Sequence, residues 1–126
     1  MSASQRFASI IVVEDDDSTR DSLQVLLKAL GYQSQSFTTA ECLESQLPLE
    51  CRRCCLVDIN LPGKSGLELC RRLSAEGHIV ILMTALVDDE TRLEATKSGA
   101  SACLEKTDLA VRLAPLLQAL QSDDAS

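Results

Sequence analysis

Four acidic residues follow directly after an apolar run near the start of the chain. They are Glu14, Asp15, Asp16 and Asp17, and the run, residues 7–13, has the β-branched composition typical of a parallel strand buried on both faces. Like charges at this spacing repel one another unless a cation or a basic side chain lies among them. Carboxylate oxygens are ligands that Mg²⁺ takes in proteins. The cluster therefore indicates a cation site, and a solvated acidic turn with Asp17 or Ser18 capping the next helix is the alternative.

A single aspartate, Asp58, ends a second apolar run. The stretch Cys54–Asp58 is interpreted as a short strand, and Pro62 and Gly63 break the chain before the next helix. Aspartate often forms turns, so Asp58 alone indicates little. In an open α/β sheet, however, ligands bind at the carboxyl ends of the strands, which gives this position a second interpretation.

Two further strand ends carry groups that suit an anion. Thr84 follows the apolar residues 79–83, and Lys106 follows the expected strand Ala102–Glu105. Taken singly, each is an ordinary polar residue at a strand end. Taken together, a hydroxyl and an ammonium group could hold phosphoryl oxygens while a cation neutralises the acids. The four strand ends therefore favour transfer of a phosphoryl group to Asp58 as the nucleophile.

Helical patterns separate these strands. They are expected from about Ser18 to Leu30, from Thr38 or Thr39 to about Gln46, from the cap Ser65 to near Gly77, from the cap Asp88 or Asp89 to about Ser98, and from about Leu109 onward. One more strand, the second along the chain, is expected around residues 33–37. With right-handed crossovers, this alternation predicts an α/β fold, a doubly wound five-stranded parallel sheet of the flavodoxin-like order 2-1-3-4-5, with five helices. The helix over residues 88–98 should be the loosest, because its one large apolar residue is Leu93.

Length and charge narrow the class of protein. The 126 residues suit one domain, residues 1–126, with an ordered core over about residues 7–121 and a frayed leader over residues 1–6. The net charge of −7 argues against direct binding to nucleic acid or to an anionic membrane. Apolar runs fall far short of the roughly 20 residues that span a bilayer, and no targeting segment is recognisable. We expect a cytoplasmic protein.

Six cysteines raise the question of a metal or redox site. Cys51, Cys54 and Cys55 are close in sequence, but the second half of a zinc site is missing and His78 has no partner at metal-ligand spacing. We expect reduced and mostly buried thiols.

Several short motifs together carry a family resemblance. They are Val12-Val13-Glu14-Asp15-Asp16, Asp58-Ile59-Asn60-Leu61-Pro62-Gly63 with Gly66, Met83-Thr84-Ala85, and Ser98-Gly99-Ala100 leading to Lys106. With these motifs the sequence resembles the response-regulator receiver domains of two-component signalling over nearly its whole length. The resemblance implies that a partner histidine kinase or phosphotransfer protein donates a phosphoryl group.

The same resemblance implies roles for individual residues. Asp58 would be the phosphoacceptor, and together with Thr84 and Lys106 it would form the catalytic set. Mg²⁺ would be held by Asp15, Asp58 and the main-chain carbonyl of Asn60, with Glu14 contributing through water.

The sequence departs from the family pattern at three positions. Glu14 stands where the family usually has Asp, which should alter the affinity for the metal but preserve binding. Thr107 replaces the usual proline after the lysine, so a trans peptide bond is expected there. Cys103 replaces an aromatic residue, so the usual coupling between the threonine and that aromatic ring cannot operate.

The main hypothesis is a phosphorylation-controlled switch that catalyses its own phosphorylation and dephosphorylation and is not a turnover enzyme. Phosphorylation would change the surface of the fourth helix, the fifth strand and the fifth helix, for an output domain, an effector or a second copy of the chain. Regulation of transcription is one such output.

Two alternatives remain from other classes. A Mg²⁺-dependent phosphohydrolase would need a base beside the nucleophile, and Asn60, two residues after Asp58, is a poor base. A phosphorylation-independent interaction module is favoured by Cys103 and Thr107.

Overall fold

Five parallel strands form one sheet in the order β2-β1-β3-β4-β5. The structure is a computed structural model that describes residues 9–125, so the expected leader at residues 1–6 and the expected strand residues Phe7 and Ala8 lie outside it. The strands are β1 (Ile10–Val13), β2 (Ser34–Phe37), β3 (Cys54–Asp58), β4 (Ile79–Thr84) and β5 (Ala102–Glu105). The predicted α/β fold and strand order are confirmed.

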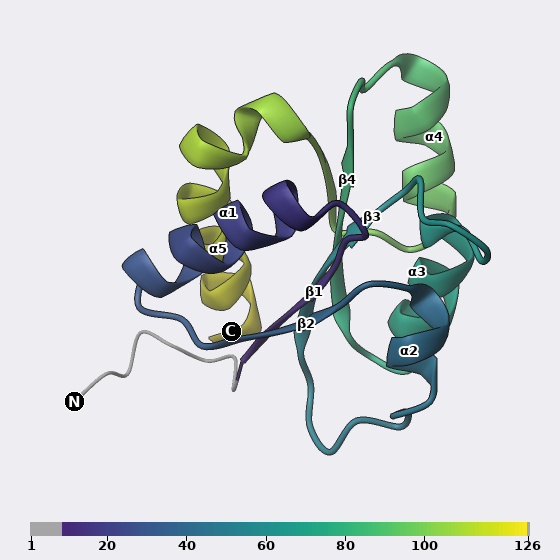
Figure 1. Ribbon diagram of the computed structural model, residues 1–126, viewed down its shortest axis with the longest axis horizontal. Coiled ribbons are helices and arrows are strands. Elements are labelled where there is room, and N and C mark those ends of the chain that lie inside the picture. Colours follow the sequence, from purple (N-terminus) through teal and green to yellow (C-terminus); the bar gives the residue numbers. More distant parts are fainter. Residues whose placement is uncertain (1–8, 126) are drawn as a thin grey trace.

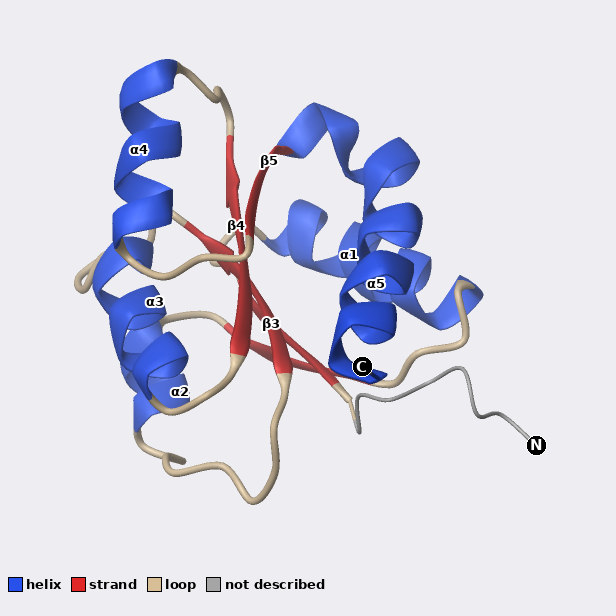
Figure 2. Ribbon diagram, turned by 180° about the vertical axis from the view of Figure 1, so that it is seen from behind, coloured by secondary structure: helices blue, strands red, loops and turns tan. Residues whose placement is uncertain are grey.

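Helices cover both faces of this sheet (Figures 1 and 2). They are α1 (Asp17–Ala29), α2 (Ala40–Glu44), α3 (Gly66–Ala75), α4 (Asp89–Lys97) and α5 (Leu109–Ala125), and the short 3₁₀ helix η1 (Lys106–Asp108) precedes α5. Helices α1 and α5 lie on one face, whereas α2, α3 and α4 lie on the other. None of the helices within residues 9–125 combines the length and hydropathy that a bilayer crossing requires.

The three central strands are buried along their whole length. Because side chains alternate along a strand, Ile10 and Val12 pack with α1 and α5, whereas Ile11 and Val13 pack with α2 and α3. Burial on both faces explains why these strands are continuous apolar runs in the sequence. Their carboxyl ends are thereby held in fixed positions at one edge of the sheet.

The cap of α1 differs from the prediction. Asp16, rather than Asp17 or Ser18, caps this helix, because its side chain accepts a hydrogen bond of 2.8 Å from the Thr19 N–H. Asp17 is the first helical residue and pairs with Arg20 instead. The other caps are Thr39, Ser65 and Asp88, all among the residues proposed from sequence.

Helix α4 buries little apolar surface, as its sequence predicts. Leu93, its one large apolar residue, is 55% exposed, and the buried residue of the helix is the small Ala95. A Leu side chain contributes to stability only when it leaves water, so Leu93 adds little here. The apolar hold on α4 is therefore weaker than the sequence suggests.

The thiols are reduced, but not all are buried. Cys54, Cys55 and Cys70 are buried, and burial raises the pKa of Cys55 to about 12. Cys42 and Cys51 are exposed and Cys103 is half-buried, so the expected burial is found for three of the six thiols.

His78 has a structural partner at the amino-terminal edge of the sheet. Its Nδ1 accepts a hydrogen bond of 3.1 Å from the Arg53 N–H, immediately before β3. Burial lowers the pKa of His78, with Arg53 and Arg52 acting in the same direction and Glu76 opposing them. The neutral imidazole is therefore the form that the fold stabilises.

Acidification should remove this stabilisation. The pKa of His78 is lower in the folded chain than its ordinary 6.5, so the unfolded chain takes up the proton first. The contribution of His78 to stability is therefore complete above about pH 6.5 and is lost as the pH falls below that value. At about pH 7.5, His78→Ala should cost about 1–2 kcal/mol, because the Arg53 N–H loses its acceptor. Urea unfolding at about pH 7.5 and 5.5 should show the difference between wild type and variant shrinking with acidification. A constant difference would contradict the role of His78.

Candidate functional site

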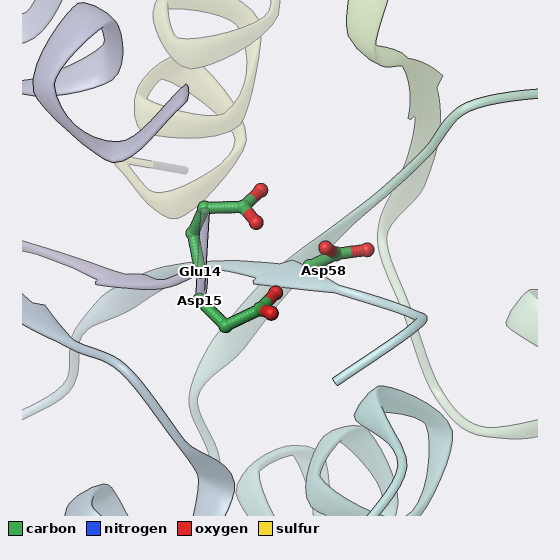
Figure 3. Close-up of side chains that lie close together, drawn as sticks. All are labelled: Glu14, Asp15 and Asp58. Atoms are coloured by element: carbon green, nitrogen blue, oxygen red, sulfur yellow. The ribbon is translucent and has the colours of Figure 1, made fainter. Parts of the chain in front are cut away.

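Three acidic side chains meet where β1 and β3 end. The two strands are neighbours with Val13 opposite Val57, so the residues that follow β1 stand beside the last residue of β3. The carboxylates of Glu14, Asp15 and Asp58 face one another (Figure 3), and each offers an oxygen within 4.8 Å of the others. Glu14 and Asp58 are buried, whereas Asp15 is exposed. The structure thus brings together the three predicted carboxylate ligands.

Lys106 reaches this cluster from the end of β5. Its Nζ lies 2.9 Å from Asp58 Oδ2 and 3.0 Å from Glu14 Oε1. Strand β4 separates β5 from β3, so the length of the lysine side chain is what allows the contact. Within residues 9–125 the one cis peptide bond is Leu47-Pro48, so the bond before Thr107 is trans, as predicted. The trans bond does not prevent Lys106 from reaching Asp58.

The electrostatics of the cluster are dominated by burial and by this lysine. Burial raises the pKa of Glu14, although hydrogen bonding from Asp16 and Lys106 acts in the opposite direction. Partial burial by itself would lower the pKa of Lys106, but the hydrogen bonds and charges of Asp58 and Glu14 outweigh it and raise that pKa. The ammonium group thus remains charged and compensates the acids.

Asp58 is held by both of its carboxylate oxygens. Oδ2 accepts from Lys106, and Oδ1 accepts a hydrogen bond of 2.9 Å from the Asn60 N–H. The Ile59 N–H donates to the Met83 carbonyl at 2.9 Å, which continues the sheet contact one residue past β3. Asp58 therefore sits in a defined orientation at the sheet edge, and the contribution of the Asn60 carbonyl to a metal site stays a prediction.

Thr84 lies at the neighbouring strand end. Asp58 is opposite Met83 in the β3–β4 pairing, so Thr84, the last residue of β4, comes one position further along. It is buried, with 5% of its surface exposed. All the predicted strand-end residues therefore gather at one edge of the sheet.

The residues present fit a hard divalent cation. Three carboxylates supply oxygen ligands, which is the donor set that Mg²⁺ prefers. Glu14 Oε1 is buried and lies 3.0 Å from Lys106 Nζ, and a carboxylate oxygen has a second lone pair that a cation can use. Lys106 already supplies one positive charge to the same group of acids.

Some contacts that support the site were not predicted from the sequence. Arg20 donates from Nη1 to the Glu14 carbonyl at 3.1 Å and so holds the acidic turn against α1. The ammonium group of Lys64, in the loop after β3, pairs with Glu44 of α2 at 2.9 Å. The backbone N–H of Lys64 donates to the Glu41 carboxylate. These partners lie 20 or more residues from Lys64 in the chain, and nothing in the local sequence signals them.

The chain is similar to proteins of one family. The family described as "Response regulator receiver domain" matches residues 10–119. The transcriptional regulatory protein FixJ of Azorhizobium caulinodans is 43% identical over 98 residues, which cover 75% of this chain and 46% of that protein. FixJ of Bradyrhizobium diazoefficiens is 35% identical over 99 residues, covering 77% of this chain and 48% of that protein. The chain thus spans about half the length of these relatives.

Solved structures share the fold. The BeF3-activated receiver domain of DrrB, a Thermotoga maritima protein, superimposes with a TM-score of 0.75 at 28% identity, covering 89% of this chain and 98% of that one. A receiver domain of a signal transduction histidine kinase from Syntrophus aciditrophicus gives a TM-score of 0.80 at 27% identity, covering 92% and 91% of the two chains.

Gly66, the first residue of α3, has no room for a side chain. A Cβ at this position would lie 2.1 Å from the Asp58 carbonyl oxygen and 2.8 Å from the Ile59 Cα. Gly66→Ala should therefore displace the backbone at Asp58 and destabilise the fold by about 1–3 kcal/mol, as overpacking generally does. Urea unfolding measures this change. Arg71→Ala, on the exposed side of the same helix, should stay within about 0.5 kcal/mol of wild type, and equal stabilities of the two variants would contradict the clash.

Proposed function

Because the chain belongs to the response regulator receiver domain family of two-component signalling, we propose that it is a phosphorylation-controlled switch with Asp58 as the phosphoacceptor. Domains of this family are signalling domains rather than turnover enzymes. The observation that carries the proposal is the contact of Lys106 with both Asp58 and Glu14 in a buried cluster of acids. A buried carboxylate with a cation beside it suits a reaction that brings in a highly charged phosphoryl group.

The proposed reaction uses the carboxylate of Asp58 as the nucleophile. One of its oxygens forms a bond to phosphorus, while the bond from phosphorus to the nitrogen of a donor histidine breaks and its electron pair leaves with the imidazole. Lys106 then exchanges its contact with Asp58 for the phosphoryl oxygens, and the Thr84 hydroxyl donates to another of them. Mg²⁺ held by Glu14, Asp15, Asp58 and the Asn60 carbonyl would supply neutralisation of phosphoryl charge when bound.

The partner and the output follow from this role. We infer a histidine kinase or a phosphotransfer protein as the donor, in the cytoplasm. Two of the relatives are transcriptional regulatory proteins, and this chain spans about half of each, so we infer that phosphorylation here controls transcription through a further domain or an effector. Direct binding of this domain to nucleic acid is not part of the proposal, because its net charge is −7.

The alternatives have weaker support. The trans bond at Thr107 was one of two departures favouring a phosphorylation-independent module, yet Lys106 still lies 2.9 Å from Asp58. A phosphohydrolase would need a base beside Asp58, and Asn60 instead donates its N–H to the carboxylate.

Phosphorylation of Asp58 can be tested with acetyl phosphate as the donor. Wild type with Mg²⁺ should gain about 80 Da by mass spectrometry, the mass of one phosphoryl group, and Asp58→Asn should gain none because the amide is a poor nucleophile. Asp88→Asn is the matched control, since it changes an exposed acid at the same sheet edge and keeps a good helix cap. A wild type that gains no phosphate, or an Asp58→Asn that gains as much, would overturn the proposal.

The surface formed by α4, β5 and α5 is the proposed output face. A groove of about 640 Å³ lies there, lined among others by Cys103, Val111 and Leu116, and Val111 is 78% exposed. An apolar side chain this exposed on a grooved face suits contact with a second copy of the chain.

Val111→Glu should therefore weaken self-association of the phosphorylated protein at least about tenfold, because a charge would have to be buried in the contact. Sedimentation velocity with and without acetyl phosphate measures the change. Val25→Glu on α1, where the valine is 70% exposed, is the control and should associate as wild type does. Equal weakening by both substitutions would argue against this face.

A further inference from the structure

The side chain of Glu105 joins β5 to the segment that begins α4. Glu105 is the last residue of β5, and its Oε1 accepts a hydrogen bond of 2.9 Å from the Val87 N–H. Val87 lies in the connection between β4 and α4, 18 residues away in the chain. A carboxylate that accepts from a backbone N–H makes one of the stronger kinds of hydrogen bond.

This contact lies directly beside the proposed phosphoryl site. Lys106 follows Glu105 in the chain, and Thr84 is opposite Glu105 in the β4–β5 pairing. The two residues proposed to contact the phosphoryl group therefore lie close to this hydrogen bond, Thr84 at the end of β4 and Lys106 directly after β5. A shift of either residue can therefore change the geometry of the Glu105–Val87 contact.

The two ends of α4 are held in different ways. At the carboxyl end, the Ser98 carbonyl accepts from Cys70 Sγ at 3.5 Å and from Ser74 Oγ at 3.2 Å, which fastens this end to α3. In the middle of the helix Leu93 is 55% exposed, and before the amino end the hydrogen bond from Val87 ties the preceding connection to β5. The helix is thus anchored at one end by α3 and at the other through Glu105.

Cys103 stands at the position where the family has an aromatic side chain. Its thiol leaves a groove open between α4 and α5. Cys103 lines the groove between α4 and α5 together with Arg92 and Ala95. A thiol is too small to transmit movement of Thr84 to the helix by packing. The Glu105 carboxylate, by contrast, is already in contact with the connection that carries Thr84 into α4.

We propose that Glu105 is the positioning residue that couples the phosphoryl site to α4. In the unphosphorylated protein its hydrogen bond to Val87 holds the start of the helix against β5. When Thr84 and Lys106 move to the phosphoryl group, the hydrogen bond is lost and the start of α4 is released, while its other end stays on α3. This inference rests on the proposed function for its trigger, but the contact itself can be tested without phosphorylation.

The first test measures the contact in the unphosphorylated protein. Amide hydrogen exchange of Val87, followed by NMR, should be at least about tenfold faster in Glu105→Ala, which has no acceptor. Glu105→Gln keeps a side-chain oxygen and should stay within about threefold of wild type. Glu94→Ala, an exposed position on α4, is the control and should leave the rate unchanged. Equal Val87 exchange in wild type and Glu105→Ala would overturn the proposal.

The second test measures the coupling. With acetyl phosphate and Mg²⁺, Glu105→Ala should gain phosphate to the same extent as wild type, while the phosphorylation-dependent change in amide chemical shifts over residues 87–97 falls at least about twofold, because the start of α4 is already released. A change as large as in wild type would overturn the coupling. If wild type itself gains no phosphate, the proposed function fails, and Val87 exchange still decides whether Glu105 holds the connection.

Discussion

The ion pairs of Lys106 with Asp58 and Glu14 are the interactions on which the candidate site depends. Two buried carboxylates side by side would be costly to fold without a positive charge between them. Lys106 directly follows β5, which is adjacent to neither β1 nor β3 in the sheet, so its ion pairs join the ends of these three strands. Because it contacts the proposed phosphoacceptor directly, any chemistry at Asp58 must also change the position or the partners of Lys106.

The sheet makes this arrangement possible by fixing where the strands end. Strands β1, β3 and β4 are buried on both faces, and a shift of one residue in register would move each strand-end side chain to a new position. The buried central strands therefore hold the acids and Thr84 in nearly fixed positions. Gly66 adds to this precision, since the close approach of α3 to the Asp58 backbone leaves no space for a Cβ.

Helix α4 is held more by hydrogen bonds than by apolar packing. It buries Ala95 but not Leu93, and polar contacts through Ser98 and Glu105 do much of what apolar packing does elsewhere. Hydrogen bonds to a helix end can be exchanged at low cost, whereas a packed core cannot be rearranged gradually. A domain that keeps its site fixed while its surface changes needs both a packed core and an element held by exchangeable hydrogen bonds. Here the buried strand β4 ends at Thr84, and α4 follows it in the chain.

The local sequence was sufficient for the fold and for the position of the acids, the threonine and the lysine at the strand ends. The apolar runs of the central strands, the helix caps Thr39, Ser65 and Asp88, and the acids, threonine and lysine at the strand ends are all local signals, because burial and capping act on neighbouring residues. What only the tertiary structure decided were contacts between distant segments. The pairing of Lys106 with Glu14, the exposure of Leu93, and the hydrogen bond from Val87 to Glu105 depend on how helices and loops settle on the sheet. These contacts depend on which of several distant groups each side chain lies near in the folded chain. Neighbouring residues in the sequence do not determine that.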